Sequence, residues 1–347
     1  MTGRPAATVV IPTHRRTDSL LRVLEALGRQ DVPAGTFEVV VVCDGLDDPS
    51  LTVLHPEEFS AFPLRVVEQG NKGPAAARNR GVQLAQGDLI VFLDDDVVPS
   101  RGLVCAHLDA HRDTEDLVVV GPLLPPPGHG SPWVRFEGRT LDEQYRAMET
   151  GQWEMTYRQF YTGNASVGRD VFLAAGGFDE TFRRAEDVEL ALRLHNRGAR
   201  FTFARHAHVE HIAQRSYRSW RDIGYRYGRA DVRMGPEKGG QAPVEIAGRE
   251  FHERHPLTRR LVMLSLAAPA GGRVIEVAAR PLSVLLAAVG LTAVADRLLA
   301  GAFNLAYWRG LADEIGGAGR ARQLIAGARL ASPSIGSGDV YPDSRQT

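Results

Sequence analysis

The sequence predicts an α/β fold in which a mainly parallel central sheet is flanked by helices, followed by a helical C-terminal extension. Short apolar runs alternate with helical patterns over residues 7–120, and repeated β-α-β units build a parallel sheet. Residues 39–42 are consecutive valines, which is typical of a central strand covered on both faces. After residue 217 the pattern is helical, with breaks at glycine and proline.

The elements follow one another along the chain. Residues 7–11 form an apolar run that ends at Pro12, as expected for a buried strand. Asp18 is a favourable N-cap for a helix with leucines on one face, and Pro74 suits the first position of another helix. We expect further strands at residues 39–42, 64–67, 89–93, 117–120, 164–167 and 200–203, and further helices at residues 74–84, 103–111, 186–197 and 217–233.

The composition is that of a globular protein whose charges nearly cancel. Because the formal net charge is −1, no basic surface indicates nucleic acid as a partner. Cys43 and Cys105 are too few for a disulfide framework. The first residues lack a signal-peptide pattern, and no apolar run reaches the roughly 20 residues of a spanning helix. We expect a cytoplasmic protein.

Three adjacent acids, Asp94, Asp95 and Asp96, follow the expected strand at residues 89–93. Ligands bind at the carboxyl ends of parallel strands, and Asp44 ends another strand. Adjacent carboxylates repel one another unless water or a cation screens them, and their hard oxygens suit Mg²⁺ or Mn²⁺, which bridge phosphates. The other interpretation is a solvated acidic turn that caps the next helix.

A glycine-rich segment, residues 70–81, precedes and begins the helix at Pro74. Its glycines let the backbone approach a ligand, and a helix start offers free N–H groups to an anion. Lys72 and Arg78 add positive charge. Alone, the segment is a weak signal, because Gly-Pro before an alanine run is typical of ordinary helix initiation.

The third signal is the pair Glu186 and Asp187 at the start of a helix. Spacings of three and four residues put Asp187 on one face with Ala191 and Leu194. Such a carboxylate either has a structural partner or points into a cleft, and it also interacts favourably with the helix dipole. Glu189 and Arg193 are spaced to pair on the solvent face.

Taken together, these segments resemble the family 2 glycosyltransferases, which have the GT-A fold. Any one segment would be a weak signal, but they occur in the family's order. The matching stretches are residues 9–13, 39–44, 71–79, 92–96, 163–164, 176–180 and 186–187.

The resemblance implies a role for each matched residue. Lys72 and Arg78 would help to hold a nucleotide-diphospho-sugar donor, Asp187 would be the general base, and Asp94 and Asp96 would form the metal-binding Asp-x-Asp pair with Mg²⁺ or Mn²⁺. Further donor-binding residues would be Pro12, Thr13, Arg15, Asp44 and Asp95, and the sugar and acceptor pocket would include Asn164, Gly176, Gly177 and Glu186.

His211 is a further candidate metal ligand, because related enzymes often place a histidine near the metal after the equivalent strand. The alternative is a surface histidine, since His206 and His208 lie close by. The resemblance also implies an inverting single displacement. Processive members carry Gln-x-x-Arg-Trp, a spacing that residues 214–220 do not keep, so we expect transfer of one sugar, with uridine and deoxythymidine donors favoured because Asp44 could pair with a pyrimidine imide.

The resemblance implies a catalytic domain over residues 1–235, with a donor half at about 1–122 and an acceptor half at about 123–235. A helical region at 236–331 and a disordered tail at 332–347 would follow. Two other functions remain open: a non-catalytic sugar-nucleotide-binding scaffold, and a metal-dependent nucleotidyltransferase. The acceptor could be a glycan, a lipid carrier or a small molecule.

The apolar helix around residues 284–291 also has two interpretations. It packs against the catalytic domain or a dimer partner, or it lies on a membrane with Arg297, Tyr307, Trp308 and Arg309 at the boundary. The second interpretation would make the protein peripheral on the inner face of the cell membrane.

Overall fold

The computed structural model describes residues 3–114, 116–182, 185–234 and 243–328. The chain divides into two compact units, one of Met1–Pro126 and Tyr145–Ile212, the other of Pro127–Gln144 and Ala213–Thr347. The first unit holds the α/β sheet and the second holds the C-terminal helices, as the sequence predicts. The expected domain boundary at residue 235 stays a prediction, and the expected disordered tail at 332–347 lies outside the described residues.

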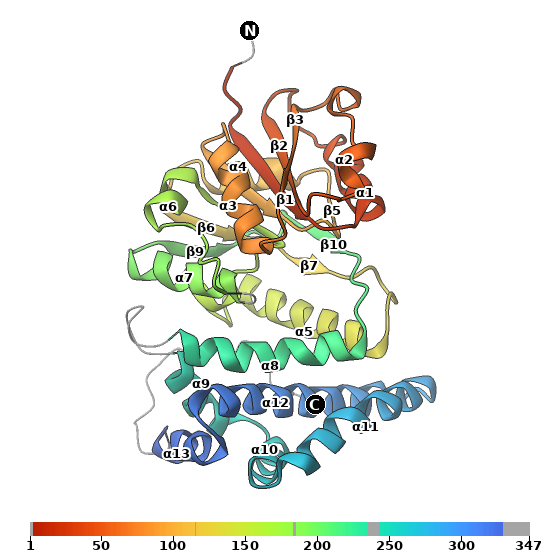
Figure 1. The fold of residues 1–347 in the computed structure, drawn as a ribbon, viewed down its shortest axis with the longest axis vertical. Helices are drawn as coiled ribbons and strands as arrows, with labels where there is room; N and C mark the ends of the chain where they lie inside the picture. The colour runs from red at the N-terminus through yellow and green to blue at the C-terminus, as the bar shows by residue number, and fades with distance from the viewer. Residues whose placement is uncertain (1–2, 115, 183–184, 235–242, 329–347) are drawn as a thin grey trace. The chain divides into compact units, whose positions relative to one another are not determined.

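The first unit is built around a seven-stranded sheet in the order β3-β2-β1-β4-β8-β6-β9 (Figure 1). Its strands are parallel except for β8, which pairs antiparallel with both β4 and β6. The prediction of a mainly parallel sheet is therefore confirmed. The strands are β1 (Ala7–Thr13), β2 (Phe37–Asp44), β3 (Leu64–Gln69), β4 (Leu89–Leu93), β6 (Leu117–Val120), β8 (Asn164–Gly168) and β9 (Arg200–Phe203).

Helices cover both faces of this sheet. Successive side chains of a strand point to opposite faces, so Val39 and Val41 pack with α1 (Thr17–Leu27) and α4 (Leu103–Ala110), whereas Val40 and Val42 pack with α3 (Pro74–Leu84). A Cβ on Gly81 of α3 would lie 2.3 Å from Val10 Cγ1, so glycine allows this helix to approach β1 closely. The smaller elements are α2 (Ser50–Val53), α6 (Arg169–Ala174), α7 (Glu186–Asn196), and the 3-10 helices η1 (Pro56–Glu58) and η2 (Tyr157–Gln159).

A second, three-stranded sheet in the order β5-β10-β7 was not expected from the sequence. It consists of β5 (Val97–Pro99), β7 (Leu123–Leu124) and β10 (Val209–His211). Strand β10 runs antiparallel to β5 and parallel to β7. This sheet matters for the site because β5 directly follows the three acids and β10 ends at His211.

The second unit is helical, as the sequence predicts. Trp220 and Phe303 lie in one of its cores, and Phe251 and Trp308 lie in another. None of the helices in the described ranges has both the length and the apolar character to cross a bilayer. The helices are α8 (Tyr217–Arg233), α9 (Pro243–Glu253), α10 (Pro256–Ala267), α11 (Pro269–Ala288), α12 (Thr292–Ile315) and α13 (Ala318–Ala328), together with α5 (Pro132–Glu149), whose residues after Gln144 belong to the first unit.

Candidate active site

The three acids lie at an edge of the main sheet where several segments meet. Strands β1, β2 and β4 are parallel and all end at this edge, and the acids directly follow β4. Because β8 is antiparallel to β4, it begins at this edge, with Asn164 opposite Leu93. The segments that the sequence suggested for the site therefore come together within the first unit.

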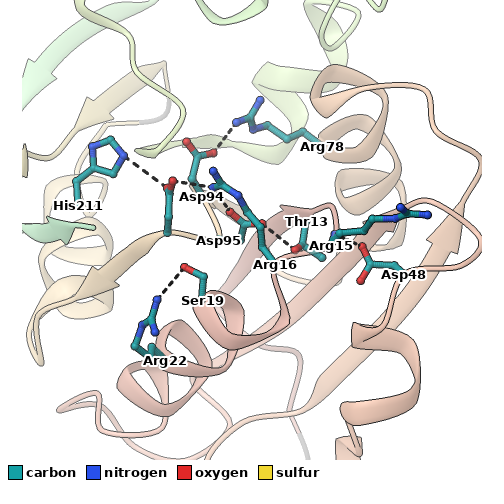
Figure 2. A network of polar contacts seen from close by, with 11 residues as sticks. Thr13, Arg15, Arg16, Ser19, Arg22, Asp48, Arg78, Asp94, Asp95 and His211 are labelled. Atoms are coloured by element: carbon teal, nitrogen blue, oxygen red, sulfur yellow. Dashed lines mark hydrogen bonds and ion pairs between the residues drawn. The ribbon is translucent and has the colours of Figure 1, made fainter. Parts of the chain in front are cut away.

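Arg16 bridges two of the acids, a contact that the sequence analysis missed. Its Nη1 donates to Asp95 Oδ1 (3.0 Å) and to Asp96 Oδ2 (2.7 Å). Thr13 Oγ1 donates to the other oxygen of Asp95 (2.7 Å). Figure 2 shows Arg16 reaching toward Asp95. The chain's own cation thus screens the carboxylate repulsion that the sequence implies.

The two bridged acids differ in their pKa. Burial raises the pKa of Asp95 to about 6, and the charge of Arg16 and the hydrogen bond from Thr13 only partly oppose this shift. Burial also disfavours the charged form of Asp96, but the contact with His211 and the charge of Arg16 outweigh it and lower the pKa. Asp96 is therefore the acid that is held firmly as a carboxylate.

His211 reaches this cluster through the small sheet. It lies opposite Val97 in the antiparallel pairing of β10 with β5, and the Ile212 N–H donates to the Asp96 carbonyl (2.9 Å). His211 Nε2 is 3.6 Å from Asp96 Oδ1, and its side chain is mostly buried. The structure therefore places His211 beside the acids, whereas His206 and His208 are exposed.

Arg78 links the acidic turn to the start of α7. Its Nη2 donates to Asp94 Oδ1 (2.6 Å) and its Nη1 to Glu186 Oε1 (3.1 Å). The side chain of Arg78 is only 5% exposed. Burial disfavours its charged form, but the carboxylates of Asp94 and Glu186 outweigh burial and raise its pKa. A buried cation thus joins residues that are far apart in the sequence.

Asp187 lies next to Glu186 at the beginning of α7 and is partly exposed. Its Oδ1 accepts a hydrogen bond from the Val188 N–H (2.8 Å), while Ala191 and Leu194 on the same helix are fully buried. Ala185, just before the helix, has a φ of +59°. A non-glycine residue rarely adopts this left-handed conformation, and such strain is most frequent at functional sites.

Asp44 has a different environment from the one that the resemblance implies. Its carboxylate accepts hydrogen bonds from Gln69 Nε2 (2.9 Å) and from the backbone N–H groups of Lys72 and Gly73 (both 2.8 Å). It is buried and fixes the glycine-rich segment, and its expected contact with the donor stays a prediction. Gly73 has a φ of +97°, which explains the glycine before Pro74. The side chain of Lys72 is exposed.

The end of β1 and the turn that follows it hold two more of the expected donor-binding residues. Pro12 lies within the strand and is partly buried. Arg15 adopts a φ of +53°, and its backbone N–H donates to buried Asp48 while its guanidinium pairs with Asp47. These aspartates, which the sequence analysis did not single out, hold the turn at the end of β1 in place.

Asn164 is fully buried, and its side chain binds other groups of the chain. Its Nδ2 donates to the carbonyls of Pro122 (3.2 Å) and Ala207 (2.6 Å), and its Oδ1 lies 3.0 Å from His107 Nε2. Asn164 thus has a positioning role, in which it ties together the ends of β6, β8 and the segment before β10, and its expected place in the sugar and acceptor pocket stays a prediction.

The Gly176–Gly177 turn is held by side chains from two helices. Both glycines have positive φ, and Asn79 of α3 exchanges hydrogen bonds with the Phe178 backbone (both 2.9 Å). Arg193 donates to the Gly177 carbonyl (2.6 Å) and to both oxygens of Glu189 (2.8 and 2.6 Å). The prediction that Glu189 pairs with Arg193 is confirmed, but its placement on the solvent face is wrong, because Glu189 is fully buried.

The acids and His211 fit a divalent cation that is shared with a phosphate ligand. Within the described ranges, no three His, Cys, Asp or Glu side chains gather into a complete ligand set. Asp96 and His211 nevertheless face each other, and Asp94 is partly exposed on the same turn. Mg²⁺ sites commonly use one or two carboxylates and complete the shell with phosphate oxygens and water, so this donor set suits such an ion.

Solved structures with a similar fold include a mannosyltransferase and a protein named TarS. A mannosyltransferase from Pyrobaculum calidifontis, in complex with GDP-Man and Mn²⁺, is 21% identical, with a TM-score of 0.60 over 89% of this chain and 88% of that chain. Residues 1–349 of S. aureus TarS, in complex with UDP, are 18% identical, with a TM-score of 0.51 over 89% of this chain and 91% of that chain. These similarities confirm the GT-A fold.

Curated relatives are also named as glycosyltransferases. An uncharacterized glycosyltransferase, YfnE, of Bacillus subtilis is 30% identical over 59% of this chain and 65% of the relative. A validoxylamine A glucosyltransferase of Streptomyces hygroscopicus subsp. jinggangensis is 33% identical over 58% and 54%, and a pre-mycofactocin glycosyltransferase of Mycobacterium tuberculosis is 30% identical over 70% and 50%. The chain thus spans only about half to two thirds of these relatives.

The family match covers part of the candidate site. Residues 8–175 match the family described as glycosyl transferase family 2. This range contains β1, the glycine-rich segment, the three acids and Asn164, whereas Asp187 and His211 lie beyond it. This match and the relatives above show that the chain contains a region, residues 8–175, of the glycosyl transferase family 2 type.

Proposed function

We propose that this protein transfers one sugar from a nucleotide-diphospho-sugar to an acceptor hydroxyl, with inversion at the anomeric carbon. The observation that carries the proposal is the buried Arg78, which contacts both Asp94 and Glu186. Asp187 is the next residue after Glu186. This proximity supports a site in which the acids that suit a metal and a diphosphate lie near the candidate base.

On the donor side, Asp94, Asp96 and His211 would hold Mg²⁺ or Mn²⁺ together with the diphosphate of the donor. A bound ion would supply positive charge that stabilises the departing nucleoside diphosphate. Arg16 lies at the same acids and is half exposed, so its guanidinium can contribute charge to the diphosphate. The low pKa of Asp96 keeps it in the charged form that a metal ligand needs.

On the acceptor side, Asp187 would remove the proton of the attacking hydroxyl. The new bond forms between the acceptor oxygen and the anomeric carbon, and the bond from that carbon to the diphosphate oxygen breaks. The proton passes to the Asp187 carboxylate and the electron pair leaves with the nucleoside diphosphate. Asp187 is partly exposed and its Oδ1 accepts a hydrogen bond from the Val188 N–H, which supports this role.

The nucleobase of the donor is not determined by these contacts. Uridine and deoxythymidine were favoured because of Asp44, but that carboxylate binds Lys72, Gly73 and Gln69 instead. We therefore propose a screen by thermal shift with uridine, deoxythymidine and guanosine diphosphates, each with and without Mn²⁺. A ligand at 100 times its Kd should stabilise the protein by about 2.7 kcal/mol.

The decisive variant is Asp187→Asn. It should lower kcat for transfer by about 10²-fold or more, while the affinity for the nucleoside diphosphate and Mn²⁺ changes little. Transfer is measured as release of nucleoside diphosphate with a panel of acceptors, and affinity by calorimetry.

Asp170→Asn is the matched control, because Asp170 is an exposed acid in the first turn of α6. This variant should keep full activity. Loss of donor affinity in Asp187→Asn would remove Asp187 from the base role, and donor binding without turnover in the native protein would favour a non-catalytic binding protein.

A further inference from the structure

Exposed apolar side chains are concentrated in one part of the second unit. Within the described residues, all but three of the exposed large apolar side chains lie between Leu257 and Val294. Water-soluble surfaces rarely gather so many, and a contiguous apolar patch usually marks an interaction site.

Helix α11 has the reverse of the usual arrangement of a surface helix. The residues on its buried side are small or polar, namely Gly272, Glu276, Ala279 and Ser283, at spacings of four and three. Val274 and Leu285, which project from the opposite side, are 67% and 61% exposed. The large apolar side chains of α11 therefore lie on its solvent-facing side and not on the side that packs within the unit. This arrangement indicates that the solvent-facing side has a role other than packing within the unit.

The outward side of α11 also carries arginines. We define the α11 face as Val274, Val277, Val284 and Leu285, with Arg273 and Arg280 along one edge, seven residues apart. All six side chains are exposed. Exposed apolar residues also precede and follow α11 in the sequence. They are Leu264 on α10, and Val289 and Leu291 just after α11.

No acidic side chain is exposed in this stretch. Every residue from 255 to 295 is described, and Glu276 is its only acid. The Glu276 side chain is 2% exposed and accepts hydrogen bonds from Arg309 Nε (3.0 Å) and Nη2 (2.9 Å). Arg309 and fully buried Trp308 therefore belong to the interior of the unit and not to the boundary that the sequence suggested.

We propose that the α11 face docks on the surface of an anionic membrane. An interfacial helix buries its apolar side among acyl chains while arginines at its edge contact anionic headgroups, and this is the combination that α11 offers. Its other side packs on α12, so the helix would lie in the interface without entering the bilayer.

A second copy of the chain fits the face less well. In a symmetric dimer the same patch meets itself, so Arg273 and Arg280 of one copy would approach those of the other with no exposed acid in the stretch to compensate. Anionic lipid supplies the missing negative charge. This inference concerns a surface in the second unit and stands independently of the proposed transfer reaction.

The test is co-sedimentation of the full chain with vesicles of phosphatidylcholine alone and of phosphatidylcholine mixed with phosphatidylglycerol. The native protein should bind the mixed vesicles and bind them less as salt rises, because salt screens the headgroup attraction. Val277→Asp/Val284→Asp should lower the partition at least about tenfold. The double variant Arg273→Glu/Arg280→Glu should lower the partition onto the mixed vesicles by about fivefold or more for each arginine replaced.

Val53→Asp is the matched control, because Val53 is an exposed valine in α2 of the first unit. It should bind vesicles like the native protein, and circular dichroism should show all variants folded. Equal binding to both kinds of vesicle, or none to either, would overturn the proposal. A dimer in sedimentation equilibrium that Val277→Asp/Val284→Asp converts to monomer, without vesicle binding, would assign the face to a second copy.

Discussion

Among single residues, Arg78 makes the contacts that connect the two sides of the site. Replacing it with methionine removes a buried cation. The mostly buried Glu186 carboxylate then lacks the guanidinium with which it forms an ion pair. An uncompensated buried charge is costly, so Arg78→Met should lower the free energy of unfolding by about 3 kcal/mol. Urea denaturation followed by circular dichroism measures this change.

Two further variants separate charge from packing. Arg78→Met/Glu186→Gln should recover part of the lost stability, because the unpaired acid is also gone. Arg80→Met, an exposed position of the same helix, should have little effect. A double variant as unstable as Arg78→Met would mean that the arginine acts through packing and not through its charge.

Residue types in the sequence identified the acidic turn and Asp187 but not the partners of each side chain. Asp44 and Asn164 were expected to contact ligands, yet both bind the chain's own backbone groups. A carboxylate or an amide suits either kind of partner, and spacing alone does not tell them apart. Arg16 was missed because it is one arginine among many, and its contacts with Asp95 and Asp96 depend on tertiary structure.

Among the elements, α4 and β8 are joined by a buried chain of hydrogen bonds. His107 Nε2 donates to Asn164 Oδ1, so in the neutral ring Nδ1 accepts from Ser166 Oγ (2.8 Å). His111 Nε2 lies 2.9 Å from the same Ser166 oxygen. Burial lowers the pKa of both His107 and His111 to about 4. This chain of hydrogen bonds is complete only while His107 is neutral.

This chain of hydrogen bonds predicts a loss of stability in acid. Between pH 6.5, the ordinary histidine value, and pH 4, the unfolded protein binds a proton that folded His107 does not. Stability therefore falls as the pH falls through this window, by up to about 3 kcal/mol from His107. His107→Gln should lose less over the same range, as measured by urea denaturation at several pH values.

The exposed His206 provides the comparison. His206→Gln should show the same acid sensitivity as the native protein. If His107→Gln loses stability as steeply as the native chain, the proton uptake belongs to other groups.

Strands and helices of four or more residues were largely predictable. The prediction gave the observed bounds of α3, β4, β6, β9 and α8, because alternating apolar runs and helix-start residues define them locally. The small β5-β10-β7 sheet was missed because its strands are two or three residues long and exist only through pairing. The direction of β8 was also beyond local patterns, since it depends on how the chain returns to the sheet.

For the whole molecule, the second unit is discontinuous, since it takes residues 127–144 from the middle of the chain. Within it, Trp133 stacks edge-on against Tyr217, with ring centroids 5.4 Å apart, and Trp220 lies 5.6 Å from Phe303. A chain cut after Met234 would uncover Trp220. We expect this truncation to melt at lower temperature and to bind a hydrophobic dye.

A chain that ends at Ala328 keeps all described helices and is the control for this truncation. It should melt like the full chain. If the chain cut after Met234 also melts like the full chain, then α8 and residues 127–144 are stable without the C-terminal helices, and a catalytic domain over residues 1–235 gains support.

The interrupted path of the second unit has a consequence for synthesis on the ribosome. Residues 127–144 emerge well before their partners from residue 213 onward, a delay on the order of ten seconds at typical elongation rates. During this interval Trp133 and Val134, which are buried in the finished protein, have no native surface to cover them. Slower elongation of the intervening segment would lengthen this exposure, whereas a chaperone that covers these side chains until residue 213 and its successors emerge would protect the nascent chain from aggregation.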